Sequence, residues 1–161
     1  MKKLLPFFQI MFLLVFTSCI EKQDTVTEQP QFELLLPQPC DTLFFGEKIH
    51  FKVDFTDNTG LGSLYTDLHN NFGHHSHGEH ESCTMDPVKD PVNPYYNDWI
   101  FSLPSDSTKY TLDTVVDLES MLINGVDTLD WDEGDYHFHI YITDKDGYQV
   151  FTALDVKILY R

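Results

Sequence analysis

Five of the eight histidines in this chain lie between His69 and His80, in the stretch His-Asn-Asn-Phe-Gly-His-His-Ser-His-Gly-Glu-His. Imidazole is the commonest protein ligand for zinc, copper and nickel. Glycine and serine interrupt the run, and Glu79 and Glu81 add carboxylates to it. The segment therefore predicts a metal site. The alternative is a solvated polar loop, because a His-rich tract is only a compositional pointer to metal.

Two further histidines occupy the clearest strand pattern of the chain, which begins at Gly134. Successive side chains of a strand point to opposite faces. His137 and His139 therefore share one face with Tyr141, and the apolar residues between them share the other. The same argument places His69 on the outward face of a strand predicted over residues 63–71. His50 alternates with apolar residues in a strand over 48–55 and is predicted to be a surface histidine.

The strand patterns together predict an all-β protein. The remaining predicted strands are short, no segment has the period of a long amphipathic helix, and turn residues separate the strands. We expect an immunoglobulin-like β-sandwich of about seven strands, with one long His-rich loop from residue 70 to 98. The other predicted strands cover residues 32–36, 99–103, 110–118 and 149–160, with a short apolar piece at 121–123.

In an immunoglobulin-like order, the strand that carries His69 lies beside the strand that carries His137 and His139. Neighbouring strands are about 4.8 Å apart, and residues two apart along a strand are separated by about 6.6 Å. We therefore expect these three imidazoles to converge on one ion. The loop is expected to add His75 and His77, with His74 and His80 as secondary ligands. Zinc is the preferred ion, and copper and nickel are alternatives.

The N-terminus has the pattern of an export signal. Lys2 and Lys3 precede a short apolar run that is too short for a stable membrane span. The run ends in Phe-Thr-Ser-Cys, which resembles a bacterial lipobox, although phenylalanine replaces the usual leucine. We predict a lipoprotein signal peptide over 1–18, a lipid anchor at Cys19 with a tether over 19–30, and one domain over 31–161. A secreted protein without lipid is the alternative.

Lipidation of Cys19 would leave Cys40 and Cys83. Disulfides persist outside the cytoplasm, so we predict that these two cysteines form one bridge. The competing interpretation makes Cys83, which follows His80 by three residues, a soft metal ligand.

The formal net charge of −16 excludes a nucleic-acid-binding surface, which requires a basic face. An acidic surface attracts cations and favours solubility. Asp57, Asp144 and Asp146 suggest calcium as an alternative, but a cage of 6–8 oxygen ligands cannot be assembled from their spacing. They are better explained as turn residues.

Over residues 31–161 the sequence resembles a family of uncharacterised lipoproteins of Bacteroidetes-type bacteria. The resemblance is carried by Gly46-Glu47, by the turn from Asp57 to Leu61, and by the motif His-x-Asn-Phe-x-x-His-x-His that begins at His69. It implies an immunoglobulin- or cadherin-like fold, location in the cell envelope, and importance of His69, His75 and His77. It implies no substrate.

Three classes of function are compatible with these features. The first is a cell-envelope lipoprotein that sequesters, buffers or delivers a metal ion. We expect it at the outer membrane, in contact with the membrane through its lipid only. No protein partner is indicated. The second is an adhesion or glycan-related module in which metal stiffens the loop and Tyr95, Tyr96 and Trp99 form an aromatic platform. The third is an enzyme with Glu79 or Glu81 as a base. We expect no enzyme, because no spacing selects a reaction.

Overall fold

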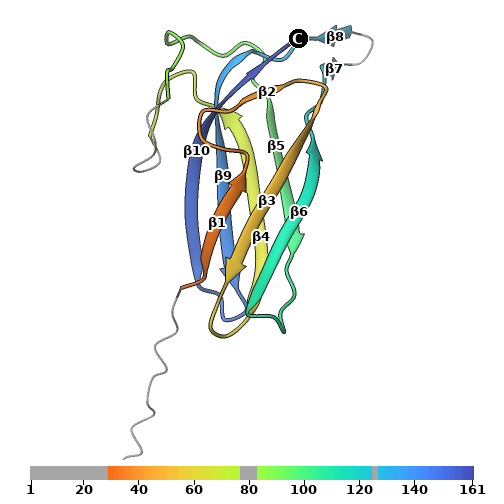
Figure 1. Ribbon diagram of the computed structural model, residues 1–161. Coiled ribbons are helices and arrows are strands. Elements are labelled where there is room, and N and C mark those ends of the chain that lie inside the picture. Colours follow the sequence, from red (N-terminus) through yellow and green to blue (C-terminus); the bar gives the residue numbers. More distant parts are fainter. Residues whose placement is uncertain (1–28, 77–82, 125–126) are drawn as a thin grey trace, which may run out of the picture.

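The computed structural model describes residues 29–76, 83–124 and 127–161, and within them the chain forms two β-sheets packed face to face (Figure 1). The smaller sheet has the order β1-β3-β6 and the larger has the order β2-β10-β9-β4-β5. The strands of the smaller sheet are β1 (Gln31–Leu36), β3 (Lys48–Thr56) and β6 (Lys109–Asp117). Those of the larger are β2 (Thr42–Phe44), β4 (Leu61–Asn70), β5 (Tyr96–Ser102), β9 (Gly134–Asp144) and β10 (Gln149–Leu159).

This arrangement confirms the predicted all-β sandwich, with more strands than the seven expected. A separate hairpin, β7 (Leu122–Asn124) with β8 (Asp127–Leu129), lies beyond the sandwich. The short strands β2 and β8 were not predicted, because three residues are too few for an alternation pattern. In the described part of the chain no helix is long and apolar enough to span a membrane.

The core forms where the inward faces of the two sheets meet. In β3 the predicted inward residues Ile49, Phe51, Val53 and Phe55 are all buried. They face the inward side of β9, where Phe138 contacts Phe51 at a ring-centroid distance of 5.5 Å. Each fully buried large apolar side chain stabilises the fold by about 1.5–3 kcal/mol relative to exposure. Because the apolar side chains of β9 face the core, the histidines of β9 lie on the opposite face of the sheet.

Tyr136 closes the top of the sandwich as a tyrosine corner. Its hydroxyl donates to the carbonyl oxygen of Asp132 at 2.5 Å and accepts from the backbone N–H of Tyr95 at 3.2 Å. Such a corner near the start of this strand is typical of immunoglobulin-like sandwiches. It ties the chain before β5 to the start of β9.

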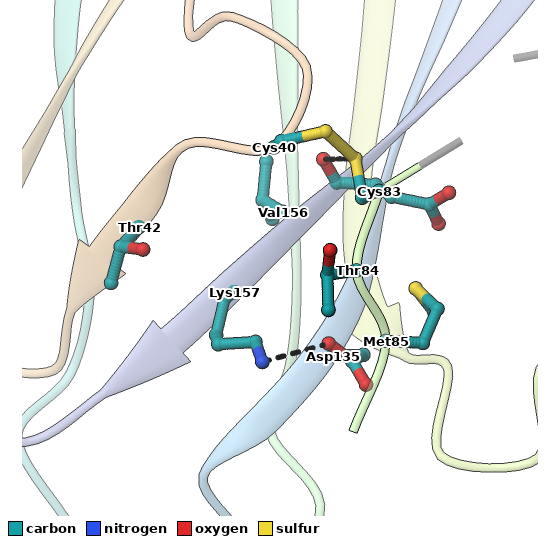
Figure 2. A pocket seen from close by; sticks show the side chains of 9 residues that line it. Cys40, Thr42, Cys83, Thr84, Met85, Asp135, Val156 and Lys157 are labelled. Carbon is teal, nitrogen blue, oxygen red and sulfur yellow. Dashed lines mark hydrogen bonds and ion pairs between the residues drawn. A yellow bond between two sulfur atoms is a disulfide. The ribbon is translucent and has the colours of Figure 1, made fainter. Parts of the chain in front are cut away.

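The segment between β4 and β5 is bound to the sheet at several points (Figure 2). Cys83 forms a disulfide with Cys40, as predicted, and the two cysteines are separated by 43 positions in the sequence. Lys157 of β10 binds Asp86 at 2.6 Å and Asp135 at 3.6 Å. Asp135 in turn accepts from the backbone N–H of Asp86 at 2.7 Å. These contacts hold the described parts of the segment against β9 and β10.

The tyrosine corner gives a first prediction. Tyr136→Phe removes the hydroxyl and leaves two backbone groups of a buried region without their partner, so we expect a loss of about 1–3 kcal/mol in the free energy of unfolding. Tyr148→Phe is the matched control, because Tyr148 is 44% exposed. Urea denaturation of both variants measures the difference, and equal stabilities would show that the corner contributes nothing.

A second prediction concerns the disulfide. The intact protein should be two hydrogens lighter than its reduced form, and reduction should lower the free energy of unfolding by up to about 4 kcal/mol for a loop of this length. Non-reducing mass spectrometry and denaturation with and without reductant measure both effects. The Cys40→Ser/Cys83→Ser double variant is the control, since reductant should leave its stability unchanged. Two alkylated thiols in protein folded under oxidising conditions would contradict the prediction.

Candidate metal centre

Three of the polar residues on the outer face of the larger sheet are buried. His137 is 1% exposed, His139 is 5% exposed and Asp67 is 7% exposed. Alternation in β4 and β9 turns these side chains away from the core, as predicted. Aromatic side chains of the sheet and the loop cover them. Phe151 lies edge-on to His139 at a centroid distance of 5.2 Å, and His75 lies edge-on to His137 at 4.8 Å.

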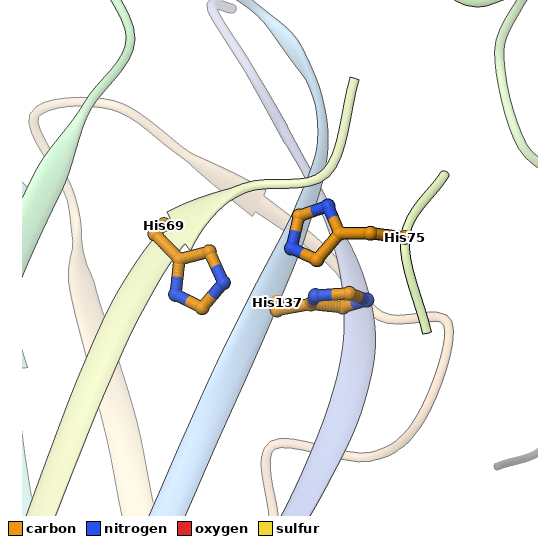
Figure 3. A group of neighbouring side chains, drawn as sticks. All are labelled: His69, His75 and His137. Carbon is orange, nitrogen blue, oxygen red and sulfur yellow. The ribbon is translucent and has the colours of Figure 1, made fainter. Parts of the chain in front are cut away.

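A first group of possible ligands consists of His69, His75 and His137 (Figure 3). One nitrogen from each lies within 4.8 Å of the others. His69 and His137 are directly opposite each other in the antiparallel pair β4–β9. His75 comes from the loop, and its ring stacks on that of His69 at 5.7 Å. Two ligands are thus set by the sheet and one by the loop.

Carboxylates hold the two sheet histidines of this group. Asp67 lies 2.7 Å from Nδ1 of His69, and Asp155 lies 2.9 Å from Nε2 of His137. Each carboxylate accepts a hydrogen bond from one ring nitrogen and thereby selects the opposite nitrogen as the metal ligand. Nε2 of His69 and Nδ1 of His137 are therefore the expected ligand atoms.

A second group consists of Asp67, His69 and His139, again with ligand atoms within 4.8 Å of one another. Asp67 is opposite His139 in the register of β4 and β9, and its Oδ2 lies 3.4 Å from Nδ1 of His139. The expected trio of His69, His137 and His139 thus divides into two groups that share His69. The rings of His137 and His139 are stacked side by side at a centroid distance of 5.8 Å, and each lies in a different group with His69.

Two pKa values are shifted within this cluster. Burial alone would raise the pKa of Asp67, but hydrogen bonds and charge from His139 and His69 outweigh it and lower the pKa. Burial lowers the pKa of His75, and the nearby His69 and His139 lower it further. Asp67 is therefore an anion at neutral pH, and His75 favours the neutral form that binds metal.

The other predicted ligands have different places. His74 has a positive φ of 53° and its Nε2 lies 3.9 Å from Asp135, outside both groups. His77, His80 and the predicted lipidation site Cys19 lie outside the described residues. Cys83 is bonded to Cys40, so the competing interpretation of Cys83 as a thiolate ligand is wrong for the oxidised protein.

Two of the three aspartates considered for calcium accept hydrogen bonds within turns instead. Asp57 accepts from the backbone N–H groups of Thr59 and Gly60, at 2.7 and 2.6 Å. Asp144 accepts from those of Asp146 and Tyr148 at 2.8 and 2.9 Å. His50 is on the surface as predicted and pairs with Asp113 at 2.6 Å.

The proposed aromatic platform does not form as expected. Tyr95 is 1% exposed, and Trp99 stacks on the core residue Phe138 at 6.3 Å, so only Tyr96 of the three faces solvent. The strand β5 begins at Tyr96, three residues before the predicted start, because residues 96–98 pair with β4.

A pocket of about 160 Å³ leads to the first group. Its lining includes His75 and His137 together with Asp155, Cys83 and Met85. A larger pocket of about 410 Å³, drawn in Figure 2, shares Cys83, Met85 and Asp155 with it. The first group is therefore accessible from solvent beside the disulfide.

Asp67 and Asp155 are the site residues that sequence reasoning missed. Both alternate onto the outward face of their strands, where carboxylates are normally solvated. Asp67 precedes His69 by two residues and thus shares its face, which was a usable signal. Nothing in the sequence paired Asp155 with His137, since the register of β9 and β10 decides that contact.

Comparison with known proteins gives a family but no activity. No curated protein matches the chain. Among solved structures, a β-glucosidase from Listeria innocua in complex with gluconolactone is 14% identical, with a TM-score of 0.44, and the match covers 81% of this chain and 16% of that chain. A mutant of the same enzyme in complex with laminaribiose is 13% identical, with a TM-score of 0.40 and the same coverage. Such distant likeness carries no argument about function.

The family of a domain of unknown function, DUF4625, matches residues 17–159. Since this match spans nearly the whole sequence, the chain belongs to the DUF4625 family.

Proposed function

We propose that this protein is a cell-envelope lipoprotein that binds a transition metal, zinc in the first place, for sequestration, buffering or delivery. The observation that carries the proposal is the approach of His69, His75 and His137, whose ligand nitrogens lie within 4.8 Å of one another. Neutral imidazoles without a thiolate suit zinc, copper and nickel. The net charge of −16 favours the approach of cations.

The carboxylates that contact two of these histidines support the proposal that the group binds metal. Metal-binding histidines usually donate their second ring N–H to a carboxylate or carbonyl, which fixes the ring and increases its basicity. His69 has Asp67 in that role, and His137 has Asp155. Asn71 adds a hydrogen bond of 3.3 Å to Asp155. Two preoriented histidines reduce the ordering needed when an ion arrives.

The position of His75 supports exchange of the ion over a purely structural role. Structural zinc sites are closed by four protein ligands. In this group, two ligands come from the sheet and the third comes from an exposed residue of the loop, beside a pocket open to solvent. An ion held in this way can leave when the loop ligand dissociates, which suits buffering or delivery.

The lipid anchor is proposed from sequence. The lipobox-like Phe-Thr-Ser-Cys at residues 16–19 supports attachment through Cys19, with the domain tethered to the outer membrane. The expectation that the protein is not an enzyme stays a prediction.

The structure also gives a reason to consider the second candidate, a surface-binding module. Tyr96, Tyr65, Tyr141 and Phe151 form an aromatic strip on the outer face beside the histidines. Tyr65 and Tyr96 are 3.3 Å apart at their hydroxyls, and the rings of Tyr141 and Phe151 are 4.7 Å apart. Tyr96 is 59% exposed and Phe151 is 39% exposed. Binding of glycans that persists after chelation and is lost in Tyr96→Ala would favour this function.

A third prediction tests the metal site with matched aspartate variants. Asp155→Asn weakens the orientation of His137, so we expect zinc affinity to fall about 10–100-fold. His75→Gln removes a ligand and should have a larger effect. Asp113→Asn is the control, because Asp113 pairs with the surface histidine His50. Competition titration against a chromophoric chelator measures the affinities, and equal affinity in all variants would contradict the proposal.

A fourth prediction concerns pH. Protons compete with metal for imidazole, so zinc affinity should fall as the pH falls through the histidine range near 6.5. The pKa of His75 is lowered, so its ring stays neutral at more acidic pH. Protons should therefore displace metal from His75 at a lower pH than from an ordinary histidine. Titrations between pH 8 and 5, with circular dichroism to verify folding at each pH, measure this dependence. Constant affinity over the range would indicate carboxylate rather than histidine ligands.

A further inference from the structure

We infer that Asp67, His69 and His139 form a second metal position, so that the imidazole of His69 bridges two ions through its two ring nitrogens. The inference rests on the proposed function, because the first ion occupies the group of His69, His75 and His137. The shared residue is the key observation: His69 belongs to both groups of possible ligands.

The strand register places His69 between the two positions. His69 is opposite His137, and two residues earlier on the same strand Asp67 is opposite His139. The ring of His69 lies 4.4 Å from that of His139 and 5.6 Å from that of His137. Its Nδ1 faces Asp67, so Nδ1 belongs to the second position and Nε2 to the first.

The distances in the second position suit an ion. Ligands at about 2.0–2.1 Å in a tetrahedron are separated from one another by about 3.3–3.4 Å. Oδ2 of Asp67 and Nδ1 of His139 are 3.4 Å apart, which matches the separation of two ligands of one ion. Asp67 would bind the ion through Oδ2, and the 2.7 Å hydrogen bond between its Oδ1 and Nδ1 of His69 would be lost when Nδ1 binds the ion.

Binding of the second ion at His69 exchanges a proton for a metal ion. The proton on Nδ1 of His69 leaves to water, and a metal–nitrogen bond replaces the hydrogen bond to Asp67. His69 then carries a negative charge that lies between the two cations. Asp67, which is 7% exposed, supplies a second negative charge in a region where an ionised carboxylate requires a cationic partner. These charges offset the repulsion between two ions about 6 Å apart, the distance given by two metal–nitrogen bonds and the ring between them.

The test is the number of zinc ions per chain, measured by native mass spectrometry on the mature protein after equilibration with excess zinc and removal of loosely bound metal. We expect two ions in the wild type and one in His139→Gln, with His50→Gln as the control that keeps two. Asp67→Asn should lose the second ion as well and should weaken the first, because Asp67 also orients His69. Circular dichroism verifies that each variant folds.

Copper(II) tests the bridge itself. Two copper(II) ions joined by one imidazolate couple antiferromagnetically, so the electron paramagnetic resonance signal of the wild type should correspond to far fewer spins than copper ions. His139→Gln, with one ion, should show about one spin per copper. A full spin count with two coppers bound would overturn the bridging role of His69.

The outcomes separate this inference from the proposed function. A wild type that saturates at one zinc ion, lost in His75→Gln and kept in His139→Gln, overturns the second position and leaves the first intact. Two ions that persist in both His139→Gln and Asp67→Asn also overturn it, because the second ion would then be bound elsewhere. Absence of any bound zinc in the wild type would overturn the proposed function as well.

Discussion

The antiparallel register of β4 and β9 is the constraint on which the candidate site depends. It sets His69 opposite His137 and Asp67 opposite His139. A shift of either strand by one residue would turn its two site side chains toward the core. Two features fix the register. The side-chain hydroxyl of Thr66 donates a hydrogen bond of 2.6 Å to the backbone carbonyl oxygen of His139. Gly62, at the irregularity where β4 begins, lies so close to β9 that a Cβ atom would be 2.6 Å from the carbonyl oxygen of Asp144.

The burial of this outer face follows from the loop and from aromatic neighbours. Polar side chains that the strand pattern directs to solvent are instead covered, and buried polar groups are unfavourable unless they have partners. The sheet supplies those partners as carboxylates, Asp67 for His69 and His139, and Asp155 for His137. The disulfide and the ion pairs of Lys157 keep the loop near the sheet. The same part of the sheet therefore buries the polar side chains, pairs them with carboxylates and holds the loop that covers them.

The fold itself carries little information about function. An immunoglobulin-like sandwich hosts many unrelated activities, so function must be argued from a particular site. Here the core face of β4 and β9 is mostly apolar, and the candidate ligands lie on the opposite face. The aromatic strip on the same face supports the alternative of a binding module. Within it, Tyr65 is opposite Tyr141, two residue pairs from Asp67 and His139.

The sequence alone determined the fold class, the disulfide partners and the faces of the strands. Alternation in β3 and β9 has a period of two and requires no knowledge of neighbours, so the inward position of Phe51 and the outward position of His137 could be predicted. The prediction that His69 lies beside His137 also held, because strand order in an immunoglobulin-like sandwich makes their strands adjacent.

The tertiary structure decided which candidate ligands lie together and which carboxylates contact them. Sequence reasoning gave His69, His137 and His139 one common ion, whereas the register divides them into two groups around His69. Asp155 meets His137 only because β10 pairs with β9 at that rung. His75 reaches His137 because the loop folds back over the sheet. Pairing register and loop path depend on contacts between residues far apart in the chain, so a local pattern cannot determine them.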